Sequence, residues 1–157
     1  MLALLCLLEY TNKKTEKPTP HTIEEPLDKG LLFVRTTLND FRALLKYQVL
    51  IPGLTPYYNH FATNDSGKNE FLIVPDRQME SFKIIVESRN KDIIVNQTEI
   101  PQIIEGDHVV VTGGAFKGVE GVVMKFKHQK RVVVELKGVG HYATAYVPGA
   151  WLERIKK

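Results

Sequence analysis

The chain has little cysteine, no long apolar segment and no clear export signal, and each absence excludes a class of protein. Its 157 residues contain one cysteine, Cys6, which excludes an internal disulfide and a cysteine zinc site and favours a reducing compartment. No apolar run approaches the ~20 residues that a membrane-spanning helix needs. The opening MLALLCLL carries no basic residue, and Leu5 rather than a small residue precedes Cys6, so it is a poor export signal. We therefore expect a cytoplasmic protein with no membrane segment.

Residue patterns typical of enzymes are also absent. The histidines are scattered singly rather than paired at the i,i+4 spacing of a metal site. Gly138–Ala143 (GVGHYA) has the letters of a dinucleotide-binding pattern, but strand-like sequence follows where the phosphate needs a helix N-terminus. Lys117 follows a glycine-rich stretch but is not succeeded by serine or threonine, so that stretch is not a P-loop. We expect no catalytic residue, no cofactor and no metal site.

Composition is that of an ordinary globular protein, with 43% hydrophobic and 25% charged residues, which suits one medium domain or two small ones. The formal net charge is only +3. The positive excess lies from residue 105 on, whereas residues 1–104 are close to neutral. A mildly basic C-terminal part suits an RNA, DNA or ribosomal partner, and an ordinary solvated surface explains so small an excess equally well.

The C-terminal third has the clearest local pattern. Two valine-rich runs, His108–Thr112 and Val119–Lys127, flank a glycine-rich connection, which predicts two strands joined by a bent loop. Arg131–Leu136 and Tyr142–Val147 add two more short strands, after turns at His128-Gln129 and Gly138–Gly140. So many short strands in succession predict a small β-barrel.

Before residue 90, strands and helices are expected to alternate. The run Leu2–Tyr10 is apolar enough for a buried strand or a helix end, and periodicity does not decide between them. Thr11–Glu25 is rich in lysine and proline and is expected to be an exposed loop. The remaining expected elements are a core strand at Gly30–Thr36, a helix at Thr37–Tyr47 capped by Thr37 or Asn39, a hairpin turn at Asn64–Lys68, a strand at Glu70–Val74 and an amphipathic helix at Pro75–Ser88.

Glu105–Val123 resembles a KOW motif, in which an acidic-glycine opening, a valine strand, a G-x-F-K-G loop and a second glycine follow in fixed order. Glu105–Ile155 as a whole resembles the C-terminal domain of the NusG family of transcription elongation factors. The resemblance implies an SH3-like five-stranded barrel whose loop contacts Rho, a small-subunit ribosomal protein or RNA. The motif and partner-binding residues that it implies are Gly114, Phe116, Lys117, Gly118 and Gly121.

The earlier part of the chain resembles the N-terminal (NGN) domain of the same family. Pro26–Val34, Ile51–Gly53 and Ile73–Asp76 match the family's strands and the entry to its third helix in outline. The sequence LLFVRTT and the C-terminal segment Lys130–Ile155 are most similar to the UpxY-like branch of the family, whose members are antiterminators of capsular polysaccharide operons. The resemblance implies that RNA polymerase is bound by this domain, with Leu31 and Phe33 as candidate contacts.

Two departures from the family pattern affect this expectation. The family's first strand and first helix have no counterpart here, and Asp28-Lys29 replaces an aromatic-proline pair. Both fall in the surface that the family uses to bind polymerase. Because a sheet without that cover leaves an apolar face and a bare edge, we expect the chain to form a homodimer through residues 1–88.

Three groups of side chains could contact partners or belong to the core. Phe116 has small or polar neighbours in its loop, which favours protrusion as a contact. Trp151 is followed by leucine, which favours a buried position that closes the end of the barrel over an exposed position for base stacking. The candidate nucleic-acid contacts around the next hairpin, which a solvated strand face explains equally well, are Lys125, Lys127, Lys130 and Arg131.

Together these patterns predict an α+β protein with two domains. Residues 1–88 form a partial NGN-type α/β sandwich with an antiparallel sheet, residues 89–102 a linker, and residues 103–157 an SH3-like five-stranded KOW barrel. We expect a non-enzymatic regulator of transcription elongation or antitermination that binds RNA polymerase and a further partner. The alternative is a KOW-type RNA- or ribosome-binding module that does not bind polymerase.

Overall fold

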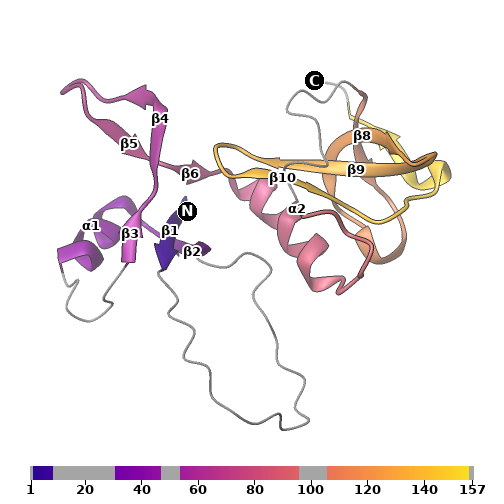
Figure 1. Ribbon diagram of the computed structural model, residues 1–157, viewed down its shortest axis with the longest axis horizontal. Coiled ribbons are helices and arrows are strands. Elements are labelled where there is room, and N and C mark those ends of the chain that lie inside the picture. Colours follow the sequence, from indigo (N-terminus) through magenta and orange to yellow (C-terminus); the bar gives the residue numbers. More distant parts are fainter. Residues whose placement is uncertain (1, 9–30, 47–53, 96–105, 156–157) are drawn as a thin grey trace, which may run out of the picture. The chain divides into compact units, whose positions relative to one another are not determined.

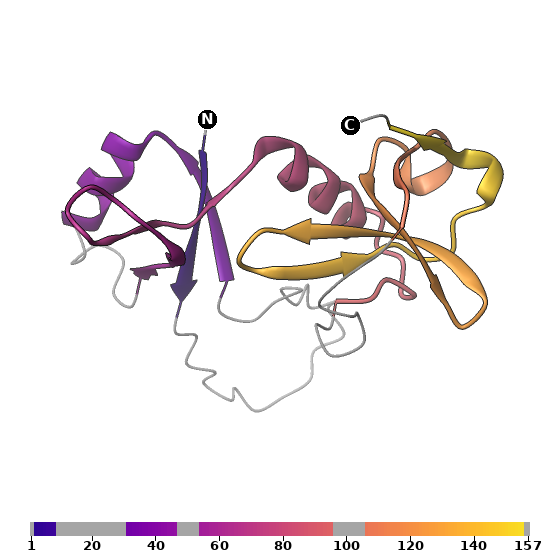
Figure 2. The same cartoon turned by 90° about the horizontal axis from the view of Figure 1, so that it is seen from above.

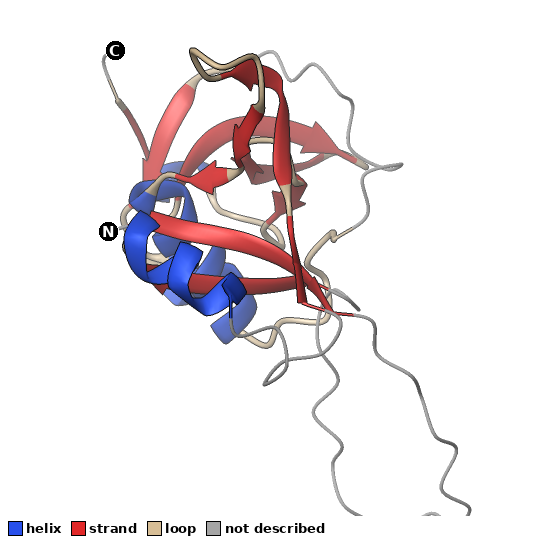
Figure 3. Ribbon diagram, turned by 90° about the vertical axis from the view of Figure 1, so that its left-hand side faces the viewer, coloured by secondary structure: helices blue, strands red, loops and turns tan. Residues whose placement is uncertain are grey.

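The structure, a computed structural model, describes residues 2–8, 31–46, 54–95 and 106–155 (Figure 1). These residues form helices and antiparallel sheets (Figure 3), so the expected mixed class is confirmed. The chain divides into two compact units, Met1–Ile73 and Val74–Lys157, which we call the N-terminal and the C-terminal unit. The expected loop at residues 11–25 and the Asp28-Lys29 pair lie outside the described residues.

A central strand organises the N-terminal unit. Strand β1 (Leu2–Leu8) lies between β2 (Leu31–Thr36) and β3 (Leu54–Pro56) and is antiparallel to both, as Figure 1 shows in indigo and magenta. Leu5 pairs with Phe33 on one side, and Leu7 pairs with Thr55 on the other. The apolar run at the start of the chain is therefore a strand and not a helix end, which were the two alternatives that its sequence left open.

Helix α1 (Leu38–Lys46) closes the core of this unit, as its apolar spacing predicts. Thr37 is its cap, because its hydroxyl oxygen accepts a hydrogen bond from the Asp40 backbone N–H at 3.2 Å and donates one to the Asp40 carboxylate at 2.6 Å. Phe41 is fully buried and packs on Leu54. Its ring meets the edge of the Phe71 ring at 5.2 Å between centroids.

The hairpin of β4 (Tyr58–Thr63) and β5 (Asn69–Phe71) has the predicted turn. The side-chain oxygen of Asn64 accepts hydrogen bonds from the backbone N–H groups of Ser66 and Lys68, both at 3.0 Å. Beyond it, the strand expected at residues 70–74 is interrupted at Leu72, whose N–H donates to the Tyr57 carbonyl at 2.8 Å. The last residues form the short strand β6 (Ile73–Val74).

Five antiparallel strands make up the sheet of the C-terminal unit, in the order β10-β9-β8-β7-β11. Their bounds are β7 (His108–Val111), β8 (Glu120–Phe126), β9 (Gln129–Leu136), β10 (Gly140–Ala143) and β11 (Leu152–Arg154). The last strand of the chain thus lies beside the first strand of this sheet, and the valine-rich runs supply the core. The fully buried members include Val109, Val111, Val119, Val132, Val133, Val134 and Leu136.

The strands of this sheet differ from the sequence-based prediction most at the start of β9 and at the end of β10. The turn after β8 lies at Lys127 and His128, which have φ of 48° and 65°, one residue before the expected turn, and β9 begins at Gln129, two residues before the expected start at Arg131. Strand β10 ends at Ala143 rather than continuing to Val147. Thr144 ends it because its side-chain oxygen accepts a hydrogen bond from the Val132 N–H at 3.0 Å and donates one to the Ala145 carbonyl at 2.8 Å.

Helix α2 (Asp76–Glu87) exists as predicted but belongs to the C-terminal unit, whereas the sequence places it in the N-terminal domain. It lies along β9 and β10 in Figures 1 and 2. The Phe82 ring contacts the Tyr142 ring at 4.6 Å between centroids. The Ser81 hydroxyl oxygen accepts a hydrogen bond from the Glu120 N–H at 3.0 Å. An amphipathic pattern reveals an apolar face but not which sheet covers it.

The segment after α2 also packs on the C-terminal sheet. Ile94 is buried, and its N–H and C=O exchange hydrogen bonds with Ala143 at 3.0 and 2.9 Å. This part of the expected linker, residues 89–102, is therefore an edge of the sheet, and residues 96–102 lie outside the described residues. The homodimer through residues 1–88 stays a prediction.

Replacing Gly121 with valine should destabilise the C-terminal unit. A Cβ at Gly121 would collide with the Val133 carbonyl oxygen and lie 2.9 Å from Cγ1 of Val132. We expect a loss of about 3 kcal/mol in the free energy of unfolding, measured by urea denaturation. Gly118→Val should also destabilise, because Gly118 has a φ of 95°. The exposed neighbour Lys117→Ala should stay within about 0.5 kcal/mol. A Gly121→Val variant as stable as the parent would contradict this close strand contact.

A fragment of residues 74–157 should be more stable than one of residues 105–157. Both should give β-rich circular dichroism and cooperative melting, since the valine core is common to both. The shorter fragment loses the buried side chains of Phe82, Ile85 and Ile94, so we expect it to be less stable by roughly 3 kcal/mol or more. Equal stability of the two fragments would mean that α2 does not contribute to the C-terminal core.

Candidate functional site

The loop between β7 and β8, residues 112–119, contains most of the motif residues and is called the glycine loop here. It forms one turn of 3₁₀-helix, η1 (Gly114–Phe116), entered through Gly114 with a φ of 75°. The Lys117 N–H donates back to the Gly114 carbonyl at 3.2 Å, and the Gly118 N–H donates to the Val111 carbonyl at 2.8 Å. These bonds make the loop a compact structure with a defined surface.

Phe116 is 5% exposed, so the prediction that its ring protrudes from the loop is wrong. The turn of 3₁₀-helix directs this side chain into the unit, where it is buried together with Val119. Small and polar neighbours along the chain do not reveal this, because they lie on the outer side of the same turn. Lys117 is exposed at the end of η1. The partner-binding role of the glycine loop stays a prediction.

Trp151 is 41% exposed, so the prediction that it plugs the barrel end is also wrong. It ends a second 3₁₀-helix, η2 (Gly149–Trp151), and its ring lies against the glycine loop. A Cβ at Gly113 would stand 3.2 Å from the indole ring, and one at Gly114 only 2.5 Å from Cζ3. Only glycine leaves room for the ring at Gly114.

The backbone of Trp151 is held by hydrogen bonds. Its carbonyl oxygen accepts from the Thr112 N–H at 2.8 Å and from the Thr112 hydroxyl at 3.2 Å. Its N–H donates to the Pro148 carbonyl at 3.0 Å. The sequence does contain a signal for this position, since Pro148-Gly149 marks a turn immediately before the tryptophan and places it in a loop rather than a strand.

The hairpin of β8 and β9 carries the candidate nucleic-acid contacts. Lys125 and Lys130 pair directly across the two strands, and both are exposed, as is Lys127 at the turn. Lys127 lies over the Phe126 ring at 5.2 Å from Nζ to the centroid. Their role towards nucleic acid stays a prediction.

Arg131 differs from these lysines because it is buried. Its Nη1 donates to the carbonyl oxygens of Asp92 and of Thr144, the latter at 3.0 Å. Its guanidinium carbon lies 5.5 Å from the centroid of the Phe126 ring. The guanidinium thus ties the segment after α2 to the sheet, and within the hairpin the exposed cations are the three lysines.

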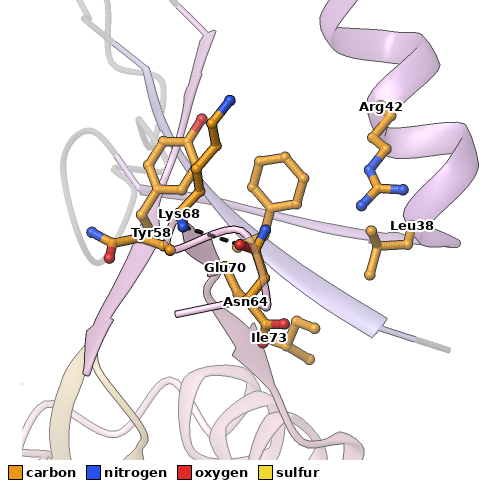
Figure 4. A pocket seen from close by; sticks show the side chains of 10 residues that line it. Leu38, Arg42, Tyr58, Asn64, Lys68, Glu70 and Ile73 are labelled. Carbon is orange, nitrogen blue, oxygen red and sulfur yellow. Dashed lines mark hydrogen bonds between the residues drawn. The ribbon is translucent and has the colours of Figure 1, made fainter. Parts of the chain in front are cut away.

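The N-terminal unit contains a separate open pocket of about 710 Å³ (Figure 4). Arg42 and Leu38 of α1 line one side, and Tyr58, Lys68 and Glu70 of the hairpin line another, as Figure 4 shows. The charged side chains of its lining are two cations, Arg42 and Lys68, and one carboxylate, Glu70. Leu31 and Phe33 of β2 are half-buried, and their role as polymerase contacts stays a prediction.

Two features are absent from the residues that the structure describes. Within them, no group of three or more His, Cys, Asp or Glu side chains is placed to hold a metal ion. No helix among them is long and apolar enough to cross a membrane.

Comparison with known proteins identifies one feature. The family model described as KOW motif matches residues 105–135, which span β7, the glycine loop, β8 and most of β9. No curated protein and no solved structure matches the chain. The match supports a KOW-containing protein, and a KOW domain suggests an SH3-like barrel. The motif is consistent with an RNA- or ribosome-associated module.

Arg131→Ala should destabilise the C-terminal unit, because it leaves the buried Thr144 carbonyl oxygen and the partly buried Asp92 carbonyl oxygen without their donor. We expect a loss of about 2 kcal/mol in the free energy of unfolding, measured by urea denaturation. The adjacent Lys130→Ala is the matched control and should change stability by less than about 0.5 kcal/mol. If both variants were equally stable, Arg131 would be a surface cation like its neighbour.

Proposed function

We propose that this chain is a non-enzymatic, cytoplasmic regulator of transcription elongation or antitermination. In this proposal the C-terminal unit is an SH3-like KOW barrel that binds RNA, Rho or a small-subunit ribosomal protein. The N-terminal unit is a partial NGN-type domain that binds RNA polymerase, and the protein acts on operons such as those for capsular polysaccharide.

The observation that carries the proposal is the KOW match over residues 105–135 on a sheet whose last strand lies beside its first. Exposed lysines of the β8–β9 hairpin and Lys117 of the glycine loop give this unit cations on its surface. Such cations favour a partner with phosphate groups or acidic side chains. An open surface with defined loops suits recognition of a macromolecule rather than chemistry on a small substrate.

Support for the polymerase-binding part comes from sequence resemblance. Strand β2 has the sequence LLFVRT, which is similar to the UpxY-like branch. A helix and a hairpin follow it in the order expected of an NGN domain. Leu31 and Phe33 offer apolar surface from that strand, because both side chains are half-buried.

A second candidate is a KOW module that binds RNA or the ribosome without binding polymerase. One observation favours it: α2, which the NGN resemblance assigns to the N-terminal domain, packs on the C-terminal sheet. An N-terminal unit without this helix has less of the surface that an NGN domain would present.

Retention on immobilised core RNA polymerase tests the proposal. The full chain should be retained, and Phe33→Ala should reduce its retention several-fold while leaving binding of RNA or a small-subunit ribosomal protein unchanged. Lys117→Ala should do the reverse. Thermal melting of each variant separates loss of contact from loss of fold. If the chain binds an RNA or ribosomal partner but no polymerase, the second candidate replaces the first.

A further inference from the structure

We propose that the open face of Trp151 is a stacking platform for an unpaired base of single-stranded nucleic acid, with Lys117 and Lys130 placed to contact its phosphates. This inference rests on the proposed function of the C-terminal unit as a nucleic-acid or ribosome-associated module, and it specifies the ligand and the contact residue.

The orientation of the indole follows from the two glycines beneath it. A Cβ at Gly113 would be 3.2 Å from each of Cδ1, Cδ2 and Cε2, so it would stand over the face of the five-membered ring. A Cβ at Gly114 would be nearest to Cζ3, Cε3 and Cη2, at 2.5 to 3.1 Å, beside the Cζ3 edge of the six-membered ring. The indole therefore lies with the face of its five-membered ring on Gly113 and its Cζ3 edge on Gly114. Since Trp151 is nevertheless 41% exposed, we infer that the opposite face is open to solvent.

The platform is also held in place before any ligand arrives. Both the N–H and the C=O of Trp151 are hydrogen-bonded, to Pro148 and Thr112, and the ring rests on the loop backbone. A side chain that is already ordered loses little conformational entropy when a base stacks on it. A ring that is supported on one face and exposed on the other is suited to binding a planar group. A ring that served only core packing would be covered on both faces.

Two exposed lysines belong to the segments around Trp151. The ammonium group of Lys130 lies beside Gly149, 3.2 Å from where a Cβ would stand, two residues before Trp151. Lys117 follows η1, whose first residue lies under the indole. Arg154, by contrast, is paired with Asp107 at 2.8 Å, and Glu153 is an exposed carboxylate close to Trp151 in the chain. The surface is thus only mildly basic, so stacking must supply much of the affinity.

This combination favours single strands over duplexes. A base in a duplex already stacks on its neighbours and cannot offer its face to the indole, whereas an unpaired base can. With two phosphate contacts on a single strand, the logarithm of the binding constant should fall with the logarithm of salt with a slope of only about −1.4. A duplex-binding surface would need a larger cationic area and would show a steeper slope.

The sole tryptophan of the chain makes the test direct, because any change in tryptophan fluorescence reports on Trp151. The full chain is titrated with eight-nucleotide single strands of RNA and of DNA, and with an RNA duplex of the same length. We expect a single strand to quench the fluorescence by half or more and the duplex to leave it nearly unchanged. The RNA and DNA arms show which sugar the platform accepts.

Affinities of variants for a labelled single strand follow from fluorescence anisotropy. Trp151→Ala should bind roughly 5- to 150-fold more weakly, the range that stacking of one base gives, and Trp151→Phe should restore most of the affinity. Lys130→Ala should weaken binding and make the salt slope shallower by about 0.7. Tyr58→Ala is the matched control, since it removes an aromatic ring of 42% exposure from the N-terminal unit, and it should bind as the parent does.

The failure of this inference is distinguishable from failure of the proposed function. If a single strand binds but neither quenches the fluorescence nor depends on Trp151, the platform is overturned while the nucleic-acid role stands. If only a small-subunit ribosomal protein binds, the platform is again overturned and the ribosome-associated role stands. Should Trp151→Ala fail to fold, quenching of the parent chain and the affinity of Trp151→Phe still decide the question.

Discussion

Pairing between the first and last strands of the C-terminal sheet is the constraint on which the rest of that unit depends. Val111 of β7 lies opposite Leu152 of β11, although the two are far apart in the sequence. The pairing continues in the hydrogen bond from the Ile155 N–H to the His108 carbonyl at 2.9 Å. It brings the end of the chain against the glycine loop. Without it, Trp151 would have no surface to lie on, and Gly113 and Gly114 would have no ring to accommodate.

The same unit distributes its cations between structural and surface roles. Arg131 and Lys130 are adjacent in β9. The Arg131 side chain is buried and donates hydrogen bonds to the carbonyl oxygens of Asp92 and Thr144, whereas Lys130 is exposed and its ammonium group lies beside Gly149. Successive side chains point to opposite faces of the strand, and the face that carries Arg131 and Val133 is covered by the segment that contains Ile94. Lys130 lies on the other face at the hairpin end of β9, before that face becomes buried at Val132 and Val134. Counting basic residues therefore overstates the number available to a phosphate.

Helix α2 extends the core of the C-terminal unit beyond the KOW motif. Phe82 and Ile85 are buried in it, and the Ser81 hydroxyl and the Gln78 side-chain oxygen accept hydrogen bonds from backbone N–H groups of Glu120 and Lys137. A small barrel has little core of its own, so an added helix contributes substantially to stability. This arrangement leaves the outer side of the glycine loop and η2 exposed.

Local sequence determined much of this protein. The valine runs predicted four of the five strands of the sheet, the apolar spacing around Phe41 and Phe82 predicted both helices, and Asn64 with Gly67 predicted the hairpin turn, because each depends on neighbours within a few residues. Only the tertiary structure decided which sheet α2 covers, that Arg131 is buried, and that Phe116 is inside while Trp151 is outside. The two aromatic predictions were wrong for one reason. Whether a ring is covered depends on elements that are distant in the sequence, and neither composition nor periodicity around the ring contains that information. For Trp151 the element is β7, whose pairing with β11 brings the tryptophan to the glycine loop, and for Phe116 it is α2, which contacts η1.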